Sequence, residues 1–283
     1  MALSSPPPKR AAVLGSPIGH SLSPVLHRAA YAALELDGWT YDAIECRAHD
    51  LPGRIDACAR GSGGRWAGLS LTMPLKRAVL PLLDEVSDLA VAVGGANTVT
   101  FPGDGRRVGD NTDVHGIVTA LSEGGVAAPS SALVLGGGAT ACSALAALRE
   151  LGLSKAALVV REPARAAAAS CAAARLNVAV TVHTFAELPD LLSAGLVVST
   201  LPAGGADAYA ALIAASGAAV FDVVYAPWPT PLAAAATAAG ATVVGGLPML
   251  VHQAVRQVEL MTGRTDVPVA AMRAAGEAAL ASR

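Results

Sequence analysis

A glycine-rich turn between a short apolar run and an alanine-rich stretch constrains the fold of this chain more than any other feature. Residues 132–141 read Ala-Leu-Val-Leu-Gly-Gly-Gly-Ala-Thr-Ala. In this GxGxxA pattern Gly136 allows a tight turn, Gly138 lets the backbone approach a pyrophosphate, and Ala141 permits close helix–strand packing. A helix that begins here presents its N–H groups to an anion. The turn predicts a dinucleotide site formed by Gly136, Gly137, Gly138, Ala139 and Thr140.

Short runs rich in Val, Leu and Ile alternate with helical stretches on both sides of this turn. An early series predicts strands at Ala11–Leu14, Tyr41–Cys46, Trp66–Leu71 and Asn97–Phe101. A later series predicts strands at Ala132–Leu135, Ala157–Val160, Val178–His183, Leu196–Ser199, Ala219–Val224 and Thr242–Val244. This alternation is typical of parallel sheets with helices on both faces. Six strands are the number that a doubly wound nucleotide-binding sheet needs.

The two series predict an α/β protein of two domains with a cleft between them. We expect an N-terminal α/β domain over residues 1–112 and a doubly wound, Rossmann-type nucleotide domain over residues 113–246. After Gly246 the apolar positions recur at helical spacing, so residues 247–283 are expected to form helices that complete the first domain.

Composition excludes several other classes of protein. The chain has 283 residues, of which 53% are hydrophobic, 15% charged and 4% aromatic, and its net charge is −2. This balance gives no electrostatic footprint for nucleic acid. No window holds about 18 apolar residues free of both charges and turn signals, and the N-terminus lacks the apolar segment of a secretory signal. Its four cysteines form no CxxC pair. We expect a cytoplasmic protein, monomer or homodimer, with reduced thiols and no metal.

The residues after the second strand of the later series indicate which dinucleotide binds. That strand ends at Val160, where the adenosine ribose of a bound dinucleotide lies. An acidic residue there favours NAD, and arginine favours the 2′-phosphate of NADP. The chain has both kinds, Arg161 and Arg165 around Glu162. Two guanidinium groups suit a phosphate, so the pattern favours NADP.

Three polar clusters follow strands of the early series. They are residues 15–24, residues 69–76, and residues 95–98 together with 109–113. Taken singly, each has an ordinary interpretation: Ser23-Pro24 as a helix start, Lys76 as an exposed helix residue, and Asn111-Thr112-Asp113 as an Asx turn and helix cap.

Taken together, the clusters resemble the shikimate dehydrogenases. The signatures of that family are GxPIxHSxSPxxHN, GxNVTxPxK, GAxNT and GxNTDxxG. They correspond here to Gly15–His27, Gly68–Lys76, Gly94–Thr98 and Gly109–Gly116. The resemblance continues, in order, at Thr200–Gly204, Phe221–Pro227, Thr230–Leu232 and Gly246–Ala254. It spans nearly the whole chain.

The resemblance implies a function and a set of residue roles. The implied activity is the reversible, NADPH-dependent reduction of 3-dehydroshikimate to shikimate, in the shikimate pathway to chorismate and the aromatic amino acids. Ser21, Ser23 and Tyr225 would hold the shikimate carboxylate. The ring hydroxyls would be bound by Thr72, Asn97, Asp113 and Gln253. Further cofactor contacts would come from Arg161, Glu162, Arg165, Thr200, Val223, Gly246 and Met249.

Lys76 and Asp113 would form the catalytic pair. Hydride addition to a carbonyl develops an alkoxide, which needs a nearby cation and a proton donor. Lys76 can supply both, and in the oxidative direction it takes the proton from the alcohol. Asp113 would orient the ammonium group and stabilise its charged form.

The chain departs from the family pattern at two places. Ser70 and Leu71 replace the asparagine and valine of GxNVT, which bears on the rigidity of that loop more than on catalysis. The family's Asn-Arg-Thr triplet at the 2′-phosphate is Val160-Arg161-Glu162 here. Val160 removes an amide, and Glu162 adds a negative charge near the phosphate, which weakens the preference for NADP without reversing it.

Three alternatives stay open at this point. The chain could be a quinate/shikimate dehydrogenase that prefers NAD, because the contacts of Ser21, Ser23 and Tyr225 decide between the two acids. It could reduce an amino-shikimate. It could also be a non-catalytic nucleotide-binding protein on the same scaffold, although such a protein has no need of Lys76 and Asp113.

Overall fold

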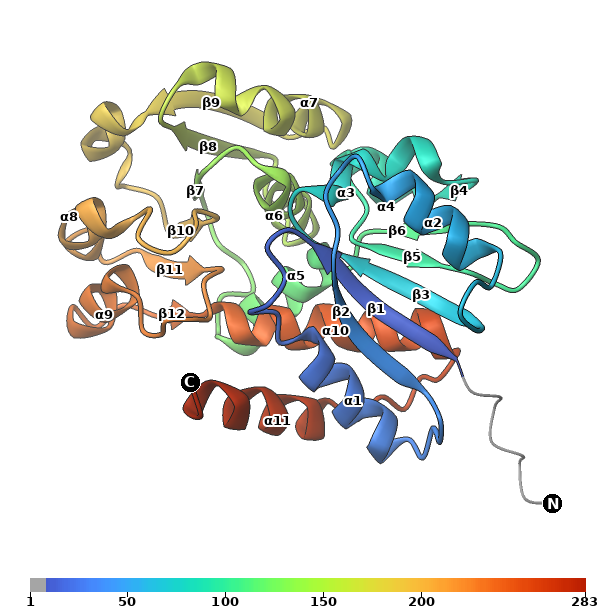
Figure 1. The fold of residues 1–283 in the computed structure, drawn as a ribbon. Coiled ribbons are helices and arrows are strands. Elements are labelled where there is room, and N and C mark those ends of the chain that lie inside the picture. The colour runs from blue at the N-terminus through green and yellow to red at the C-terminus, as the bar shows by residue number, and fades with distance from the viewer. Residues whose placement is uncertain (1–8) are drawn as a thin grey trace. The chain divides into compact units, whose positions relative to one another are not determined.

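The computed structural model describes residues 9–283, which divide into two compact units, each around its own sheet (Figure 1). The first unit comprises the chain up to Val91, Gly95–Thr112 and Gln253–Arg283. The second comprises Ala92–Gly94 and Asp113–His252. The α/β fold class predicted from the sequence is confirmed.

The first unit contains a six-stranded mixed sheet in the order β2-β1-β3-β5-β6-β4. Its strands are β1 Arg10–Gly15, β2 Thr40–Glu45, β3 Trp66–Leu71, β4 Glu85–Val86, β5 Thr98–Thr100 and β6 Val108–Asp110. β1 pairs in parallel with β2 and β3, but β5 is antiparallel to both β3 and β6. The expectation of a parallel sheet is therefore wrong for this part. Residues 101–107 join β5 to β6 as a hairpin, and a parallel pair needs a much longer crossover.

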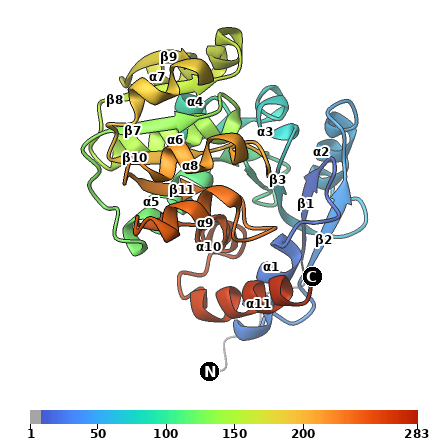
Figure 2. The ribbon, with the colours of Figure 1, turned by 90° about the vertical axis from the view of Figure 1, so that its left-hand side faces the viewer.

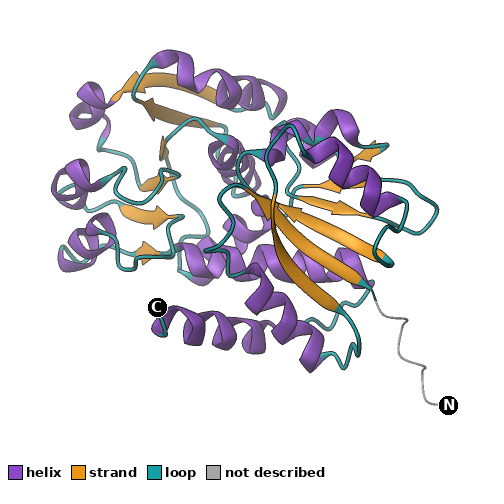
Figure 3. Cartoon of the chain, in the orientation of Figure 1, coloured by secondary structure: helices purple, strands orange, loops and turns teal. Residues whose placement is uncertain are grey.

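Helices flank this sheet, as the purple and orange ribbons of Figure 3 show. They are α1 Ser23–Ala33, α2 Leu51–Ala59, α3 Leu75–Ala78, α4 Asp88–Val93, α10 Gly246–Thr262 and α11 Val269–Ala281, with a 3₁₀ turn at Leu80–Leu82. The C-terminal helix α11 packs against α1 (Figures 1 and 2). Buried Leu14, Leu51, Ile55 and Leu69 form part of one apolar core between α2 and the sheet.

The second unit contains a six-stranded parallel sheet in the order β12-β11-β10-β7-β8-β9. Its strands are β7 Ala132–Leu135, β8 Lys155–Val160, β9 Ala179–Thr184, β10 Leu196–Ser199, β11 Ala219–Asp222 and β12 Val243–Val244. All six strands that the sequence predicts for this part are present. The chain winds outward from β7 to one edge and from β10 to the other, so β7 and β10 flank the point where the strand order reverses. Ligands of doubly wound sheets bind beside this point.

The helices of the second unit are short and rich in alanine. They are α5 Asp113–Glu123, α6 Ala139–Glu150, α7 Ala167–Arg175, α8 Ala210–Ala214 and α9 Pro231–Ala238, with 3₁₀ turns at Pro163–Ala166, Phe185–Leu191 and Asp207–Tyr209. Figure 1 shows α6 on one side of the sheet and α8 and α9 on the other. Small alanine side chains let α6 lie close to the strands, and Ala141 and Ala144 are fully buried there. Across residues 9–283, no helix combines the length and apolar character that crossing a membrane requires.

Candidate functional site

A cavity of about 250 Å³ lies in the second unit where β7 gives way to α6. It is lined by Gly136, Gly137, Gly138, Val160, Arg161, Arg165, Phe185 and Leu201. The structure thus brings the glycine-rich turn together with both arginines that the sequence singled out. All these residues lie at or just beyond the carboxyl ends of parallel strands, where ligands of such sheets bind.

Two of the three glycines are required by their protein neighbours. Gly136 has a φ of 110°, and a Cβ there would lie 2.5 Å from the Oγ1 of Thr200. A Cβ at Gly137 would lie 2.3 Å from the carbonyl oxygen of Arg165. Any side chain at either position would therefore push apart the segments that frame the cavity.

Gly138 differs, because a Cβ there meets no protein atom within 4 Å. It immediately precedes α6, and no side chain caps that helix end. Glycine here keeps the space in front of the first turn of α6 open. Helix N–H groups and the helix dipole favour an anion at such a position. This local geometry suits the pyrophosphate of a dinucleotide.

The two arginines belong to an exposed loop between β8 and α7. The Arg165 N–H donates to the carbonyl oxygen of Glu162 at 2.9 Å, which turns the chain so that Arg161 and Arg165 line the same cavity. Glu162 is exposed and is not among the lining residues. The cavity is thus bordered by two cations, which suits a phosphate group.

Phe185 and Leu201 line the cavity, but the sequence did not single them out as site residues. Phe185 directly follows β9 and stacks on Tyr209, with ring centroids 4.6 Å apart. Leu201 follows Thr200 beyond the end of β10. The signal that could have identified them is their position just after the carboxyl ends of parallel strands, because ligands of such sheets bind at this edge.

The other residues expected to contact the cofactor fall into three groups. Ala139 and Thr140 form the first turn of α6, and the Thr200 hydroxyl donates to the Leu135 carbonyl oxygen at 2.8 Å beside Gly136. Val223 lies against Gly246, where a Cβ would meet the Val223 carbonyl oxygen at 2.0 Å. Met249 is buried on α10. Val223, Gly246 and Met249 are not among the residues lining the 250 Å³ cavity.

Asp222 anchors the segment that carries Tyr225. Its carboxylate accepts hydrogen bonds from the Val224 N–H at 3.2 Å and from the Thr230 hydroxyl at 2.8 Å. Thr230 also caps α9, because its Oγ1 accepts from the Ala233 N–H. Burial raises the pKa of Asp222. The carboxylate thus fixes both ends of the loop on which Tyr225 lies.

In the first unit, Ser21 and Ser23 lie just after β1, at the start of α1. The Ser23 N–H donates to the Ser21 hydroxyl at 3.3 Å. Ser23 is buried, and α1 has no side-chain cap. Helix α1 does begin at Ser23-Pro24, as the ordinary interpretation predicts, but the Ser23 hydroxyl does not cap it.

Thr72 and Lys76 follow the carboxyl end of the neighbouring strand β3. The Thr72 N–H donates to the Leu14 carbonyl oxygen at 2.9 Å, and its carbonyl oxygen accepts from the Leu75 N–H at 2.8 Å. Lys76 lies on the single turn of α3, where its carbonyl oxygen accepts from the Ala96 N–H at 2.8 Å. These bonds fix the Lys76 backbone next to the segment that contains Asn97.

Asn97, Thr112 and Gln253 form one buried hydrogen-bonded group. Oδ1 of Asn97 accepts from the Thr112 N–H at 2.8 Å, and Nδ2 lies 3.0 Å from the Thr112 hydroxyl and 3.4 Å from Oε1 of Gln253. The structure thus unites three residues from positions far apart in the sequence, including two of the expected substrate contacts. Asp113, the next residue, begins α5 in the second unit and is buried.

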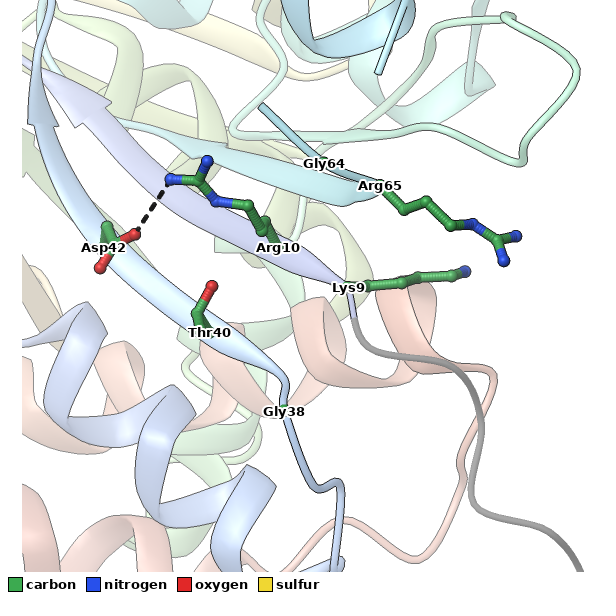
Figure 4. Close-up of a pocket in the computed structure, with 7 residues that line it drawn as sticks. All are labelled: Lys9, Arg10, Gly38, Thr40, Asp42, Gly64 and Arg65. Atoms are coloured by element: carbon green, nitrogen blue, oxygen red, sulfur yellow. Dashed lines mark ion pairs between the residues drawn. The ribbon is translucent and has the colours of Figure 1, made fainter. Parts of the chain in front are cut away.

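A second cavity, of about 390 Å³, lies in the first unit at the amino-terminal ends of β1, β2 and β3. Figure 4 shows Lys9 and Arg65 extended side by side, while Arg10 turns toward Asp42 at 3.6 Å. Arg10 and Lys9 also lie over the indole rings of Trp66 and Trp39. The polar clusters of the sequence follow the opposite, carboxyl ends of β1 and β3, so this cavity is separate from them.

Among residues 9–283 there is no group of three or more His, Cys, Asp or Glu side chains that could hold a metal ion. The candidate residues form two sets: a backbone-lined cavity with two arginines in the second unit, and a group of polar side chains in the first.

Comparisons with known proteins agree with this arrangement. Residues 13–99 match the family model of the shikimate dehydrogenase substrate binding domain, and residues 246–275 match that of the shikimate 5′-dehydrogenase C-terminal domain. A shikimate dehydrogenase (NADP(+)) from Synechococcus sp. (strain JA-2-3B'a(2-13)) is 36% identical over 283 residues, which cover 95% of each protein.

Two solved structures show the same likeness. The shikimate dehydrogenase of Mycobacterium tuberculosis aligns with a TM-score of 0.86 and 45% identity, over 96% of this chain and 100% of that chain. The shikimate 5-dehydrogenase of Thermus thermophilus, in complex with NADP(H) and shikimate, aligns with a TM-score of 0.83 and 36% identity, over 96% of this chain and 100% of that chain.

Proposed function

The chain belongs to the shikimate dehydrogenase family, and on this premise we propose that it reduces 3-dehydroshikimate to shikimate, reversibly and with NADPH. The observation that carries the proposal is a likeness over nearly the whole length to proteins named for this activity. The single cavity that unites the glycine turn with Arg161 and Arg165 supports the nucleotide half of the reaction.

Within the second unit we assign the pyrophosphate to the glycine turn. Gly138 leaves the space before α6 open, and the first-turn N–H groups at Ala139 and Thr140 would meet the anion there. Arg161 and Arg165 would hold the 2′-phosphate that distinguishes NADP from NAD. Once bound, NADPH supplies the hydride.

In the first unit, side chains would hold the substrate by its carboxylate and its hydroxyls. Ser21 and Ser23, with Tyr225 of the second unit, would bind the carboxylate. Thr72, Asn97, Gln253 and Asp113 would bind the ring oxygens. Asn97 and Gln253 are already hydrogen-bonded to each other, so their amides need little ordering when the substrate arrives.

Lys76 would act as the proton donor in the reductive direction and as the acceptor in the oxidative direction. Its ammonium group would also stabilise the negative charge that develops on the carbonyl oxygen during reduction. Asp113 would orient that ammonium group. The backbone hydrogen bond between Lys76 and Ala96 ties the position of the base to the segment that carries Asn97.

Initial-rate kinetics with shikimate and with quinate, each against NADP and NAD, test the proposal directly. We expect shikimate with NADP to give the highest kcat/KM. Equal or better use of NAD would mean that Glu162 outweighs the arginines at the ribose. Comparable turnover of quinate would assign the chain to the broader quinate/shikimate class, and no turnover with any pair would overturn the proposal. The cytoplasmic location and the monomeric or homodimeric state stay predictions from the sequence.

A further inference from the structure

A chain of buried side-chain hydrogen bonds links β2, β3, α10 and β5 of the first unit. It runs from Tyr41 through Ser70, Gln257 and Thr98 to Asn97. The successive distances are 2.6 Å, 2.7 Å, 3.2 Å and 2.9 Å. None of these five residues is more than 3% exposed. Water therefore has no access to these hydrogen bonds, and each polar group depends on its neighbour for a partner.

The donors available along this series of hydrogen bonds fix the direction of the first three, and distance favours the fourth, because the Thr98 hydroxyl lies 2.9 Å from Oδ1 of Asn97 and 3.3 Å from the Thr112 hydroxyl. Burial raises the pKa of Tyr41, so the phenol keeps its proton and donates it to the Ser70 hydroxyl. Ser70 has one hydroxyl hydrogen, and this goes to Oε1 of Gln257. Because Oε1 accepts, Nε2 of Gln257 is the atom that donates to Thr98. The Thr98 hydroxyl then donates to Oδ1 of Asn97.

A second observation fixes the Asn97 amide in the same orientation. The backbone N–H of Thr112 lies 2.8 Å from Oδ1 of Asn97, and a backbone N–H can only donate. Oδ1 is therefore an acceptor from both sides. Nδ2 is the donor, beside the Thr112 hydroxyl and Oε1 of Gln253. The two assignments agree, although one comes from a backbone group and the other from four side chains.

Ser70 and Gln257 are hydrogen-bonded to each other although they lie far apart in the sequence. Ser70 occupies the asparagine position of the family signature GxNVT, where the sequence indicated an effect on the rigidity of the loop. In the structure its partners are Tyr41 and Gln257, the latter 187 residues away. Gln257 follows Gln253 by four residues on α10, so both side chains lie on the same face of that helix.

We propose that Gln257, supported by Ser70 and Tyr41, is a positioning residue that fixes the amide of Asn97 so that Nδ2 is its donor, with a bound substrate oxygen taking the hydrogen that now meets Oε1 of Gln253 at 3.4 Å. The inference rests on the proposed function, because it takes Asn97 as a substrate contact. Rotation of the Asn97 amide by half a turn would replace this donor with an acceptor. A fixed amide avoids that loss and lowers the ordering cost of binding.

Steady-state kinetics of Gln257→Met test the proposal. Methionine retains an unbranched side chain of similar length but removes both hydrogen bonds. We expect the KM for shikimate to rise about tenfold, the equivalent of about one hydrogen bond, while the KM for NADP stays within twofold. The matched control is Thr262→Val on the same helix, which removes the 2.7 Å bond from Thr262 to the Val258 carbonyl oxygen. It should change neither constant.

Ser70→Ala interrupts the same chain one step farther from Asn97 and provides a second test. If the two residues act through one path, the double variant raises the KM for shikimate no more than the stronger single variant does. Additive effects would overturn the proposal, and so would folded single variants whose KM for shikimate stays within twofold of wild type. Should Gln257→Met fail to fold, Ser70→Ala decides alone.

The same assay distinguishes failure of the proposed function from failure of this inference. A wild-type chain that does not oxidise shikimate overturns the proposed function and this inference with it. An active wild type with unaltered variants overturns the inference only.

Discussion

The two units differ in the parts of the polypeptide that we assign to ligand binding. In the second unit, the cavity is framed by glycine backbone, a helix start and two exposed arginines. In the first unit, the residues assigned to the substrate include buried Asn97 and Gln253, which are hydrogen-bonded to each other and to a longer buried chain.

The difference follows from the chemistry of the two ligands. A pyrophosphate or phosphate carries full negative charge, which helix N–H groups and arginines attract with little demand on direction. A ring that bears several hydroxyls must be distinguished from its isomers, and this requires donors and acceptors at fixed positions. We therefore expect substitutions in the first unit to affect the reaction of the substrate, and substitutions in the second to affect the choice of cofactor.

Lys76→Ala should give the largest difference between the effect on turnover of the substrate and the effect on binding of the cofactor. Loss of the proton-transfer group should reduce kcat by about a hundredfold to ten-thousandfold. The dissociation constant of NADP, measured by isothermal titration calorimetry, should stay within twofold, because the residues assigned to the cofactor are unchanged. Arg77→Ala, at the next and exposed position of α3, is the matched control and should be nearly neutral. A Lys76→Ala variant with wild-type turnover would contradict the assignment of Lys76 as the proton-transfer group.

Acid should destabilise the first unit through His27. Burial lowers the pKa of His27 from 6.5 to about 4, and its ring stacks on Tyr41. The unfolded chain therefore binds a proton between pH 6.5 and about pH 4 that the folded chain does not, so stability is fully present above pH 6.5 and is lost as the pH falls. The loss attributable to His27 is about 3 kcal/mol near pH 4.

Urea unfolding at pH 7.5 and pH 5 measures this effect. In a Trp228→Phe background the fluorescence comes from Trp39 and Trp66, both of which lie in the first unit. His27→Gln should reduce the difference between the two pH values, whereas His49→Gln, at an exposed position, should leave it unchanged. Equal pH sensitivity in both variants would contradict the assignment to His27.

The double variant Arg161→Ala/Arg165→Ala tests whether the second unit determines the choice of cofactor. Because both arginines are exposed, we expect a loss of about tenfold to a hundredfold in kcat/KM with NADP, and little change with NAD. The KM for shikimate should not move. Arg149→Ala, on α6 outside the cavity, serves as the control. A parallel loss with both cofactors would show that the arginines do not read the 2′-phosphate.

Glu162→Gln should have the smallest effect. Removing one exposed negative charge beside the arginines should improve the KM for NADP by about twofold to threefold at low salt, and the gain should shrink at high salt. Asp190→Asn, another exposed carboxylate of the second unit, should change nothing. A variant that instead loses NADP affinity would assign Glu162 a direct role in binding.

The nucleotide cavity was largely predictable because its signals are local. The strand, the three glycines and the helix start lie within residues 132–141, and Arg161 and Arg165 directly follow the next strand. Phe185 was missed because its sequence neighbourhood carries no motif for this chemistry, and Leu201 was missed although it lies in the family segment Thr200–Gly204. Only the strand order brings the segments after β9 and β10 to the cavity.

The first unit shows where local reasoning fails. The sequence predicted β1, β2, β3 and β5, but β4 and β6 are only two and three residues long and give no periodic signal. The antiparallel orientation of β5 was missed because it depends on the hairpin to β6. The partnership of Ser70 with Gln257 spans 187 residues and has no signature in either segment. The family and the fold class were nonetheless correct, because the motifs occur in order along nearly the whole chain.

The exposed loop of Arg161, Glu162 and Arg165 has a consequence for how this protein can change during evolution. Side chains on that loop are not part of a packed core, so a substitution that alters cofactor choice leaves folding nearly untouched. The residues around Asn97 have no such independence, because each buried partner that changes leaves another without its hydrogen bond. On the proposed assignment, single substitutions can therefore change the cofactor preference, whereas a change of substrate preference requires several coordinated substitutions.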